Sequence, residues 1–286
     1  MLELISEPFA YGFMRNTLMA GLLTVVASSL IGTWVVMRGM SFMGDALAHG
    51  VLPGIAIAYV LGGNLLVGAA ISAAVMIGGV SVASARSRLG DDTAIGLLFV
   101  GMLALGVAVI SRSGAYAGDL TTILFGSPLG VTSDQVRTVA QATAVTVVVT
   151  IAMYRPFLVL SFSRAKAEVL GLRPGLTHLV MLALVAMVII SSFRAVGTML
   201  VFAFIVAPPA TAALVSRRVP VMMGVAMFIG ALGVIAGLLL SFHLGLAAAP
   251  TIAGLTVAAF FVVLAVRESL DRARTWRHRH APAAAG

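Results

Sequence analysis

The sequence predicts an all-α membrane protein that crosses the bilayer about nine times. Of its 286 residues, 60% are apolar and only 10% are charged, and the mean hydropathy is +1.11. A soluble domain carries about 25% charged residues, so this chain has less than half of that charge. One crossing needs about 20 apolar residues plus a short connection, which fits about nine crossings into this length. The composition excludes a soluble enzyme and a nucleic-acid-binding domain.

Nine apolar runs separated by charged or polar residues account for the predicted crossings. We expect residues 1–286 to form a single transmembrane domain, because no low-complexity linker divides them. If the first run did not span the bilayer, eight crossings would remain and only Arg15 would change sides. The runs are 16–37, 41–63, 65–85, 93–111, 136–154, 176–193, 195–216, 219–241 and 249–266.

Two polar stretches are longer than the other connections. Residues 113–135 separate the fourth and fifth runs and contain an apolar patch at 123–125. We interpret this stretch either as a short helix at the external surface or as an ordinary connection. Residues 155–175 separate the fifth and sixth runs and carry four basic residues.

The distribution of lysine and arginine predicts the orientation, because cytosolic loops carry an excess of these residues. Fourteen of the 18 basic residues fall on one side and four on the other. We therefore expect the 155–175 loop and the basic tail, residues 267–286, in the cytosol, and the N-terminus and the 113–135 loop outside. The cytosolic residues are Arg38, Arg86, Arg88, Arg155, Arg164, Lys166, Arg173, Arg217, Arg218, Arg267, Arg272, Arg274, Arg277 and Arg279; the external ones are Arg15, Arg112, Arg137 and Arg194.

Asp45 and His49 are the clearest ionisable residues at membrane depth, where such groups are costly and usually functional. Their spacing of four residues puts both on one face of the second predicted helix. Oxygen and nitrogen donors suit zinc, manganese or ferrous iron. One chain supplies only two ligands, but a two-fold dimer would supply four, enough for a tetrahedral shell. A purely structural Asp–His hydrogen bond is the alternative interpretation.

Glycine and proline residues around this pair predict a close-packed and interrupted helix. Gly50 and Gly54 are small enough to let a neighbouring backbone approach. Pro53 lacks a backbone N–H and so frees the carbonyl of His49, which either coordinates an ion or bonds to a nearby serine or threonine. A second interruption is expected at Pro208-Pro209 in the seventh run, and broken helices at membrane depth typically line a cavity.

The remaining candidate ligands have simpler interpretations. His178 is expected at the cytosolic edge of the sixth run as a structural residue, and His243 in an external turn as a solvated one. The 15 methionines are scattered along apolar runs, and we interpret them as packing residues. The tail residues Arg272–His280 are interpreted as an anchor at the anionic membrane surface, with lipid and not nucleic acid as the partner. The absence of cysteine excludes disulfides and thiolate ligands.

The chain has one lysine, Lys166, and lacks the glycine pattern of a phosphate-binding loop. This leaves a channel, an ion-coupled carrier, a membrane enzyme or the membrane half of an ATP-driven pump. Residues 163–172 favour the last, because they predict a short amphipathic cytosolic helix suited to docking on a motor subunit; an ordinary linker is the alternative. The residues expected to couple to the ATPase are Arg164, Lys166, Glu168, Leu170 and Gly171.

Several blocks resemble the metal-type ATP-binding-cassette permeases that import manganese, zinc or iron in bacteria. The most specific block is Arg38–His49 (RGMSFMGDALAH), followed by VLPG at 51–54. Departures from the family pattern occur at Ser163-Arg164, at 208–211 and at Ala249, and the first leaves the exact docking contacts open. Weaker blocks, in the family's order, are Asp92–Gly96, Ile123–Gly126, Gly171-Leu172, Val196–Val201 and Ala207–Ala212.

The resemblance implies a type II ABC-importer-like permease in the bacterial inner membrane, working by alternating access as a homodimer. It implies two cytosolic ATPase subunits that hydrolyse ATP, an extracytoplasmic protein that delivers the metal, and Asp45 and His49 as ligands of the transported ion. The chain itself is then expected to be no enzyme and to hold no permanent cofactor. Zinc, manganese and iron stay open, and an ion-coupled secondary carrier or channel for divalent cations is the alternative.

Overall fold

The computed structural model describes residue 8 and residues 11–86, 91–113 and 130–280, and this part of the chain folds into α-helices joined by short turns. The described residues contain no β-strand. The helices are α2 (Gly12–Met37), α3 (Phe42–Gly50), α4 (Leu52–Val60), α5 (Leu65–Arg86), α6 (Asp91–Ser113), α8 (Ser133–Ala152), α9 (Tyr154–Phe162), α10 (Arg164–Val169), α11 (Pro174–Val196), α12 (Thr198–Val215), α13 (Val219–Leu244) and α14 (Ala248–His280).

Nine stretches of the described residues are long and apolar enough to cross a membrane, which confirms the predicted fold class. Helices α3 and α4 share one of these spans, Phe42–Val60. The first span is α2, whose 26 residues make it one of the two longest, so all nine predicted runs have a candidate span among the described residues. The expected surface helix in the 113–135 loop falls on 114–129, which lie outside the described residues.

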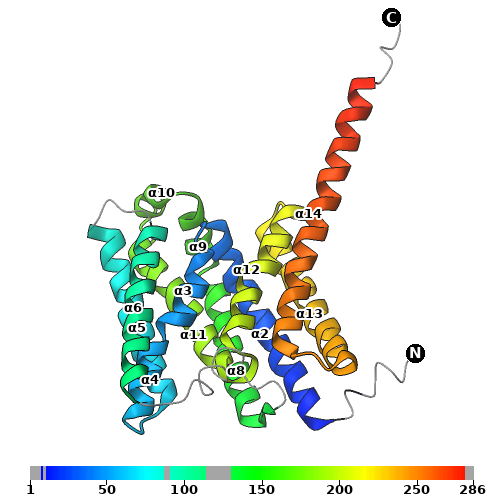
Figure 1. Ribbon diagram of the computed structural model, residues 1–286. Helices are drawn as coiled ribbons and strands as arrows, with labels where there is room; N and C mark the ends of the chain where they lie inside the picture. The colour runs from blue at the N-terminus through cyan, green and yellow to red at the C-terminus, as the bar shows by residue number, and fades with distance from the viewer. Residues whose placement is uncertain (1–7, 9–10, 87–90, 114–129, 281–286) are drawn as a thin grey trace, which may run out of the picture.

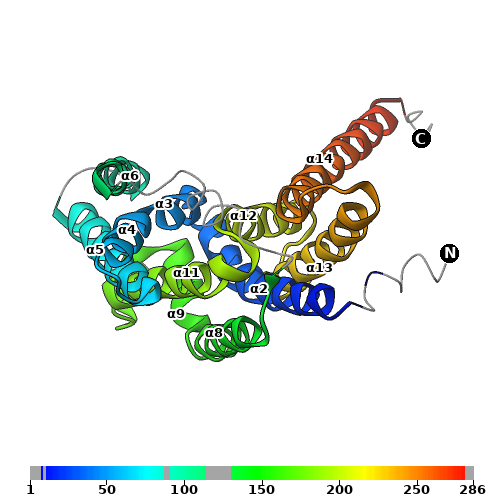
Figure 2. The ribbon, with the colours of Figure 1, turned by 60° about the horizontal axis from the view of Figure 1, so that its bottom comes forward.

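Helix α2 runs through the middle of the bundle and contacts α8, α11, α12 and α13. One flank is formed by α3–α6 and the other by α13 and α14, with α11 and α12 beside α2 (Figure 1 and Figure 2). The core where these helices meet is fully buried. Its large side chains include Ile31 and Trp34 of α2, Leu182 and Ile189 of α11, and Phe204 of α12.

Successive spans alternate in direction, so the connections fall at two opposite ends of the bundle. Figure 1 places α9, α10 and the C-terminal end of α14 at one end and the beginning of α2 at the other. This grouping agrees with the predicted grouping of the basic loops, and we refer to the first end as the predicted cytosolic end. Helix α14 has 33 residues and projects from the bundle beyond its apolar span Ala248–Leu270.

Local signals in the sequence define several helix ends. At the start of α8, the Thr132 hydroxyl accepts a hydrogen bond from the Gln135 N–H at 3.3 Å, and the Gln135 side chain accepts one from the Thr132 N–H at 3.1 Å. This reciprocal pair is a capping box. Gly39 and Gly245 follow α2 and α13 with φ of +69° and +63°, a conformation that suits glycine and permits tight turns.

The predicted interruption at Pro208-Pro209 is wrong, because α12 continues through both prolines to Val215. Pro209 has no N–H to offer the carbonyl of Ile205, four residues earlier. That carbonyl instead faces Gly32 of α2, so closely that a Cβ at position 32 would overlap with it. A neighbouring backbone thus covers the gap in the hydrogen-bond ladder, and both prolines are buried.

Candidate functional site

Asp45 and His49 both lie on α3, and the structure places their side chains together. The distance from His49 Nε2 to Asp45 Oδ1 is 3.5 Å, and each side chain is 28% exposed in the single chain. Residues four apart on a helix share a face, as the sequence predicts. A carboxylate inside an apolar helix bundle is costly, so we take this pair as the centre of the candidate site.

Aromatic and small residues hold the histidine ring in place. The ring of His49 meets Phe99 of α6 edge to face with centroids 5.8 Å apart, and Phe99 meets Phe42 in the same way at 5.4 Å. On α3, Gly44 leaves room for the ring of Phe202 from α12, which a Cβ would approach to 3.1 Å. The buried His49 Nδ1 has no hydrogen-bond partner among the described residues. The ring is therefore positioned by packing, with Nε2 turned to the carboxylate.

The chemistry of the pair suits a divalent transition metal. Carboxylate oxygen and imidazole nitrogen bind zinc, manganese and ferrous iron. Within the described part of the chain, however, no three histidine, cysteine, aspartate or glutamate side chains come together. A four- or six-coordinate ion therefore needs donors beyond this pair, from a second copy of the chain, from backbone carbonyls or from water. The pair alone offers two of the four donors that a tetrahedral ion needs.

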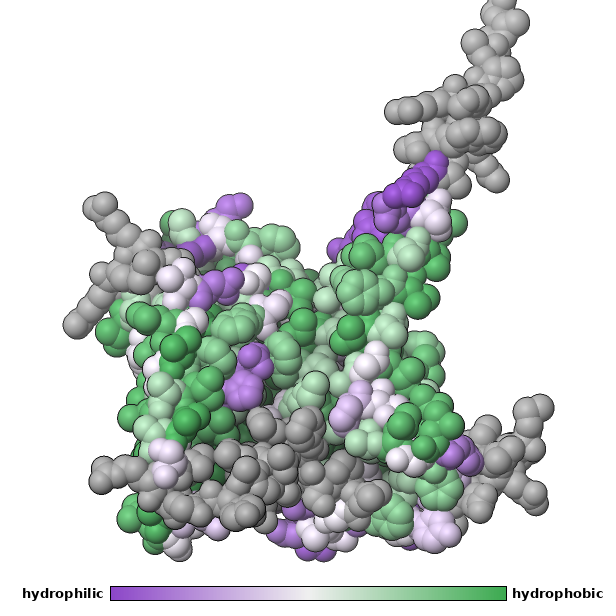
Figure 3. Space-filling model, in the orientation of Figure 1, coloured by the Kyte–Doolittle hydropathy of each residue, from purple (hydrophilic) through white to green (hydrophobic). Residues whose placement is uncertain are grey.

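Helices α6, α3, α12 and α14 lie along one side of the bundle (Figure 2). Figure 3 shows a small hydrophilic area at the level of α3 within a mainly hydrophobic surface. The spans in α6 and α14 are only 17% and 22% buried, the lowest values among the described spans. Their exposed apolar side chains include Leu97 and Val100 on α6 and Phe261 on α14. Extended apolar surface of this kind contacts lipid or another protein.

The predicted interruption beside the pair is confirmed, because α3 and α4 are separate helices. The hydroxyl of Ser72 on α5 bridges them: it donates to the carbonyl of Gly50 at 2.9 Å and accepts from the N–H of Gly54 at 3.2 Å. A serine therefore does satisfy a carbonyl at this break. The carbonyl that Ser72 satisfies is that of Gly50. The expectation concerned the carbonyl of His49, which loses its helical partner at Pro53.

The close backbone approach predicted at Gly50 and Gly54 is confirmed at Gly54, whereas the close neighbour of Gly50 is a side chain. A Cβ at Gly54 would overlap with the carbonyl of Gly68 on α5, and a Cβ at Gly50 would overlap with the sulfur of Met76. Because α5 lies directly against α3 and α4, it supports the helix that carries the pair.

The predicted cytosolic helix forms as α10. The Ser163 hydroxyl caps its start by accepting a hydrogen bond from the Lys166 N–H at 3.3 Å. At its end, Gly171 has a φ of +70°, and the N–H of Leu172 donates to the carbonyl of Ala167 at 2.9 Å. Ala167 is 1% exposed. This residue is therefore the point through which α10 rests on the bundle.

Helix α9 leads into α10 and is anchored by aromatic packing. Tyr154 and Phe157 of α9 contact Trp34 of α2, with ring centroids 5.4 and 5.7 Å apart. Trp34 and Phe157 are both almost completely buried. The α9–α10 segment is therefore joined directly to the central helix of the bundle.

The surface around α10 combines charged and apolar side chains. Arg164 and Glu168 form an exposed ion pair, with 3.7 Å between Nε and Oε1. Phe162, Val169 and Leu170 are 74%, 88% and 53% exposed. Leu170 was among the residues expected to couple to an ATPase, whereas Phe162 and Val169 were not. Their signal was present, because apolar side chains beside a charged cytosolic helix mark a protein contact.

His178 and His243 lie away from the α3 pair. His178 is half-buried near the start of α11, and His243 is exposed at the end of α13. Neither joins a cluster of three metal-ligating side chains within the described part of the chain. Their structural and solvated roles stay predictions.

Comparisons with known proteins match nearly the whole chain. A family model described as the ABC 3 transport family matches residues 10–267. The chain is 35% identical over 263 residues to the chelated iron transport system membrane protein YfeD of Yersinia pestis, covering 92% of this chain and 88% of that protein. It is 37% identical over 253 residues to the manganese transport system membrane protein MntC of Listeria innocua, covering 88% and 90%.

A solved structure shows the same arrangement of helices. A chain of PsaBC from Streptococcus pneumoniae, in complex with Fab, is 27% identical and superposes with a TM-score of 0.80. The match covers 92% of this chain and 94% of that chain.

Proposed function

Since the chain belongs to the ABC 3 transport family, we propose that it is the membrane permease subunit of an ATP-driven importer of divalent transition-metal ions. It is a metal-type ABC transporter permease, and its relatives are membrane proteins of chelated iron and manganese transport systems. One observation of this chain carries the proposal for import of an ion. A carboxylate and an imidazole, each 28% exposed, stand 3.5 Å apart in an apolar helix bundle.

Two copies of the chain complete the ion site in this proposal. A two-fold axis beside α3 brings together two Asp45 carboxylates and two His49 rings, which is a tetrahedral set of donors. Added water or backbone carbonyls extend it to the six ligands that manganese and ferrous iron prefer. The exposed pair and the low burial of α6, which packs against α3, support a homodimer at α3. The names of the relatives favour manganese or iron over zinc as cargo.

The ion is cargo and not a resident cofactor, so its ligands must bind it and then release it. Binding replaces part of the hydration shell with protein donors. When the two copies rock apart, each half-site keeps two donors, and the weakened set releases the ion to the other side. The chain itself makes and breaks no covalent bond in this cycle.

A separate cytosolic ATPase supplies the energy in this proposal, and an extracytoplasmic metal-binding protein delivers the ion to the bacterial inner membrane. The exposed Val169 and Leu170 beside α10 support docking of the ATPase. Because α9 contacts Trp34, a movement of α9 and α10 is transmitted directly to the central helix α2. The proposed coupling residues are Arg164, Lys166, Glu168, Leu170 and Gly171.

Uptake of radioactive manganese into proteoliposomes that contain the chain and its ATPase partner tests this function. We expect Asp45→Asn and His49→Gln each to lower uptake by more than about tenfold, because even indirect partners of a bound metal are worth that much. ATP hydrolysis and the folded state should be retained. Asp134→Asn and His243→Gln make the same chemical changes at exposed positions outside the site and should leave uptake unchanged.

Two results would contradict the proposal in different ways. Normal uptake in both site variants would remove Asp45 and His49 from the ion path. Uptake that continues without ATP, or without the ATPase subunit, would instead support an ion-coupled carrier or a channel. Competition by unlabelled iron and zinc in the same assay ranks the three candidate metals.

A further inference from the structure

We propose that a pocket between α12 and α14, at their predicted cytosolic ends, binds one anionic phospholipid molecule. The pocket has a volume of about 590 Å³. Two arginines and several apolar side chains form its wall, and no acidic residue does. The lining residues are Ala213, Leu214, Val215, Ser216, Arg217, Val262, Val263, Val266, Arg267 and Leu270. This inference is independent of the transported ion and of the ATPase.

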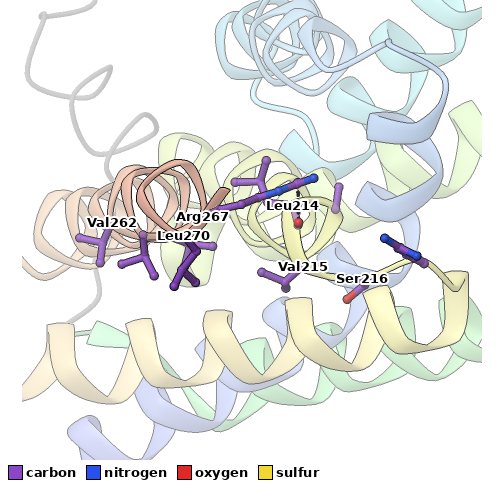
Figure 4. A pocket seen from close by; sticks show the side chains of 10 residues that line it. Leu214, Val215, Ser216, Val262, Arg267 and Leu270 are labelled. Atoms are coloured by element: carbon purple, nitrogen blue, oxygen red, sulfur yellow. Dashed lines mark hydrogen bonds between the residues drawn. The ribbon is translucent and has the colours of Figure 1, made fainter. Parts of the chain in front are cut away.

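The two arginines give the rim of the pocket a positive charge. Arg267 reaches across from α14 and donates from Nη1 to the carbonyl of Leu214, in the last turn of α12, at 2.5 Å (Figure 4). This bond fixes the guanidinium where the two helices separate. Arg217 lies just past the end of α12 and is exposed. Guanidinium groups form strong charge-assisted hydrogen bonds to phosphate.

Most of the apolar wall lies on the bilayer side of these charges, because Val262, Val263 and Val266 precede Arg267 on α14, whereas Leu270 lies one turn beyond it. Val262 and Leu270 of α14 and Val215 of α12 line the same space in Figure 4. Val215, Val266 and Leu270 are 57%, 53% and 55% exposed in the single chain. The apolar span of α14 ends at Leu270. The pocket therefore sits where hydrocarbon gives way to lipid headgroups, and Val262 and Val266 continue its wall into the bilayer.

A phospholipid is the occupant that matches both parts of the pocket. A free phosphate ion would use the arginines but leave about half a dozen apolar side chains without a partner. A phospholipid brings a phosphate and acyl chains in the same order in which the pocket presents charge and apolar wall. Basic pockets between membrane helices on the cytoplasmic side are typical sites for anionic headgroups. A second copy of the chain would have to place an acidic group beside the two arginines. The test below distinguishes this occupant from a phospholipid.

Native mass spectrometry of the full-length protein, released from nanodiscs of phosphatidylglycerol or phosphatidylcholine, tests the proposal. We expect retained phosphatidylglycerol but not phosphatidylcholine. Arg217→Gln and Arg267→Gln should each weaken that retention by about fivefold, the effect of one basic residue at the membrane surface. Arg218→Gln removes the same charge one residue outside the pocket and should have no such effect.

A second pair of variants tests the shape of the pocket without changing its charge. Val266→Trp fills the space between the helices and should abolish retention, whereas Val257→Trp, on the same helix but outside the pocket, should not. Equal losses in Arg217→Gln and Arg218→Gln would show only diffuse attraction of surface charge and overturn the proposal. Equal retention of both lipids would overturn it too. So would a photoreactive side chain at position 266 that links to another copy of the chain and not to lipid.

Discussion

Gly32 shows how the absence of one side chain allows two distant segments to share a contact. Its Cα lies against the carbonyl of Ile205, which Pro209 has deprived of its helical partner. An exposed carbonyl inside a membrane protein is costly unless something covers it. Glycine is the residue that can cover it with backbone alone.

We expect Gly32→Ala to lower the free energy of unfolding by about 2 kcal/mol, within the range for overpacked cores. A Cβ at this position overlaps with backbone, which cannot move aside as a flexible side chain can. Gly101→Ala is the matched control, because a Cβ there meets nothing within 4 Å. Unfolding in mixed detergent measures both. Equal stability of the two variants would refute the role of the Ile205 contact.

The pairing of Asp45 with His49 could be predicted from spacing alone, since residues four apart share a helix face. What surrounds the pair could not be predicted in this way. Phe99 comes from α6 and Phe202 from α12, and neither is close to α3 in the sequence. The surroundings of the pair depend on which helices pack against α3, and the sequence of α3 alone does not predict them.

Among the elements, the membrane spans were the most predictable part of the fold. Each is a long apolar run, and hydrophobicity alone defines it. Proline was a poorer guide. The interruption at Pro53 forms, and Ser72 bridges it, whereas α12 continues through Pro208-Pro209 because α2 covers the freed carbonyl. A local rule cannot distinguish the two cases, since the difference lies in the neighbouring helix.

Helix α10 offers a test of the proposed docking surface. We expect Val169→Glu to weaken retention of the ATPase partner by about tenfold or more, because a carboxylate buried in an apolar contact is costly. The fold should be unaffected, since Val169 is 88% exposed. Copurification of the two subunits measures the effect.

Leu246→Glu is the matched control for this variant. Leu246 is 49% exposed and lies in the turn between α13 and α14, at the opposite end of the bundle from α10. The same apolar-to-acidic change there should leave the ATPase bound. Loss of the partner in both variants, or in neither, would remove α10 from the docking surface.

At the scale of the whole molecule, the contacts between segments far apart in the sequence could not be predicted from the sequence. The Asn16 side chain donates to the carbonyl of Val131 at 3.0 Å, and the Thr143 hydroxyl donates to the carbonyl of Leu23 at 3.1 Å. These bonds join α2 to α8 and to the turn before it. The acceptors, Val131 and Leu23, are apolar residues that take part through their backbone carbonyls alone. The pattern of side chains in the sequence therefore does not predict these bonds.

The natural absence of cysteine makes the orientation directly testable. Leu61, between α4 and α5, is 77% exposed, and Val169 lies at the opposite end of the bundle. We expect a membrane-impermeant maleimide to label Leu61→Cys in intact cells. Val169→Cys should be labelled only after permeabilisation, because cytosolic loops carry the excess of basic residues. The reverse pattern would invert the predicted orientation.

The length of helix α14 makes its C-terminal end a sensitive indicator of rotation of the bundle. A straight helix of 33 residues is about 50 Å long, whereas the hydrocarbon core of a bilayer is about 30 Å thick. When a rigid rod tilts, its far end moves by a distance proportional to its length. A tilt of 10° about its base displaces the tip of such a helix by about 9 Å. A spectroscopic label near the free end would therefore record small rotations of the bundle as large displacements.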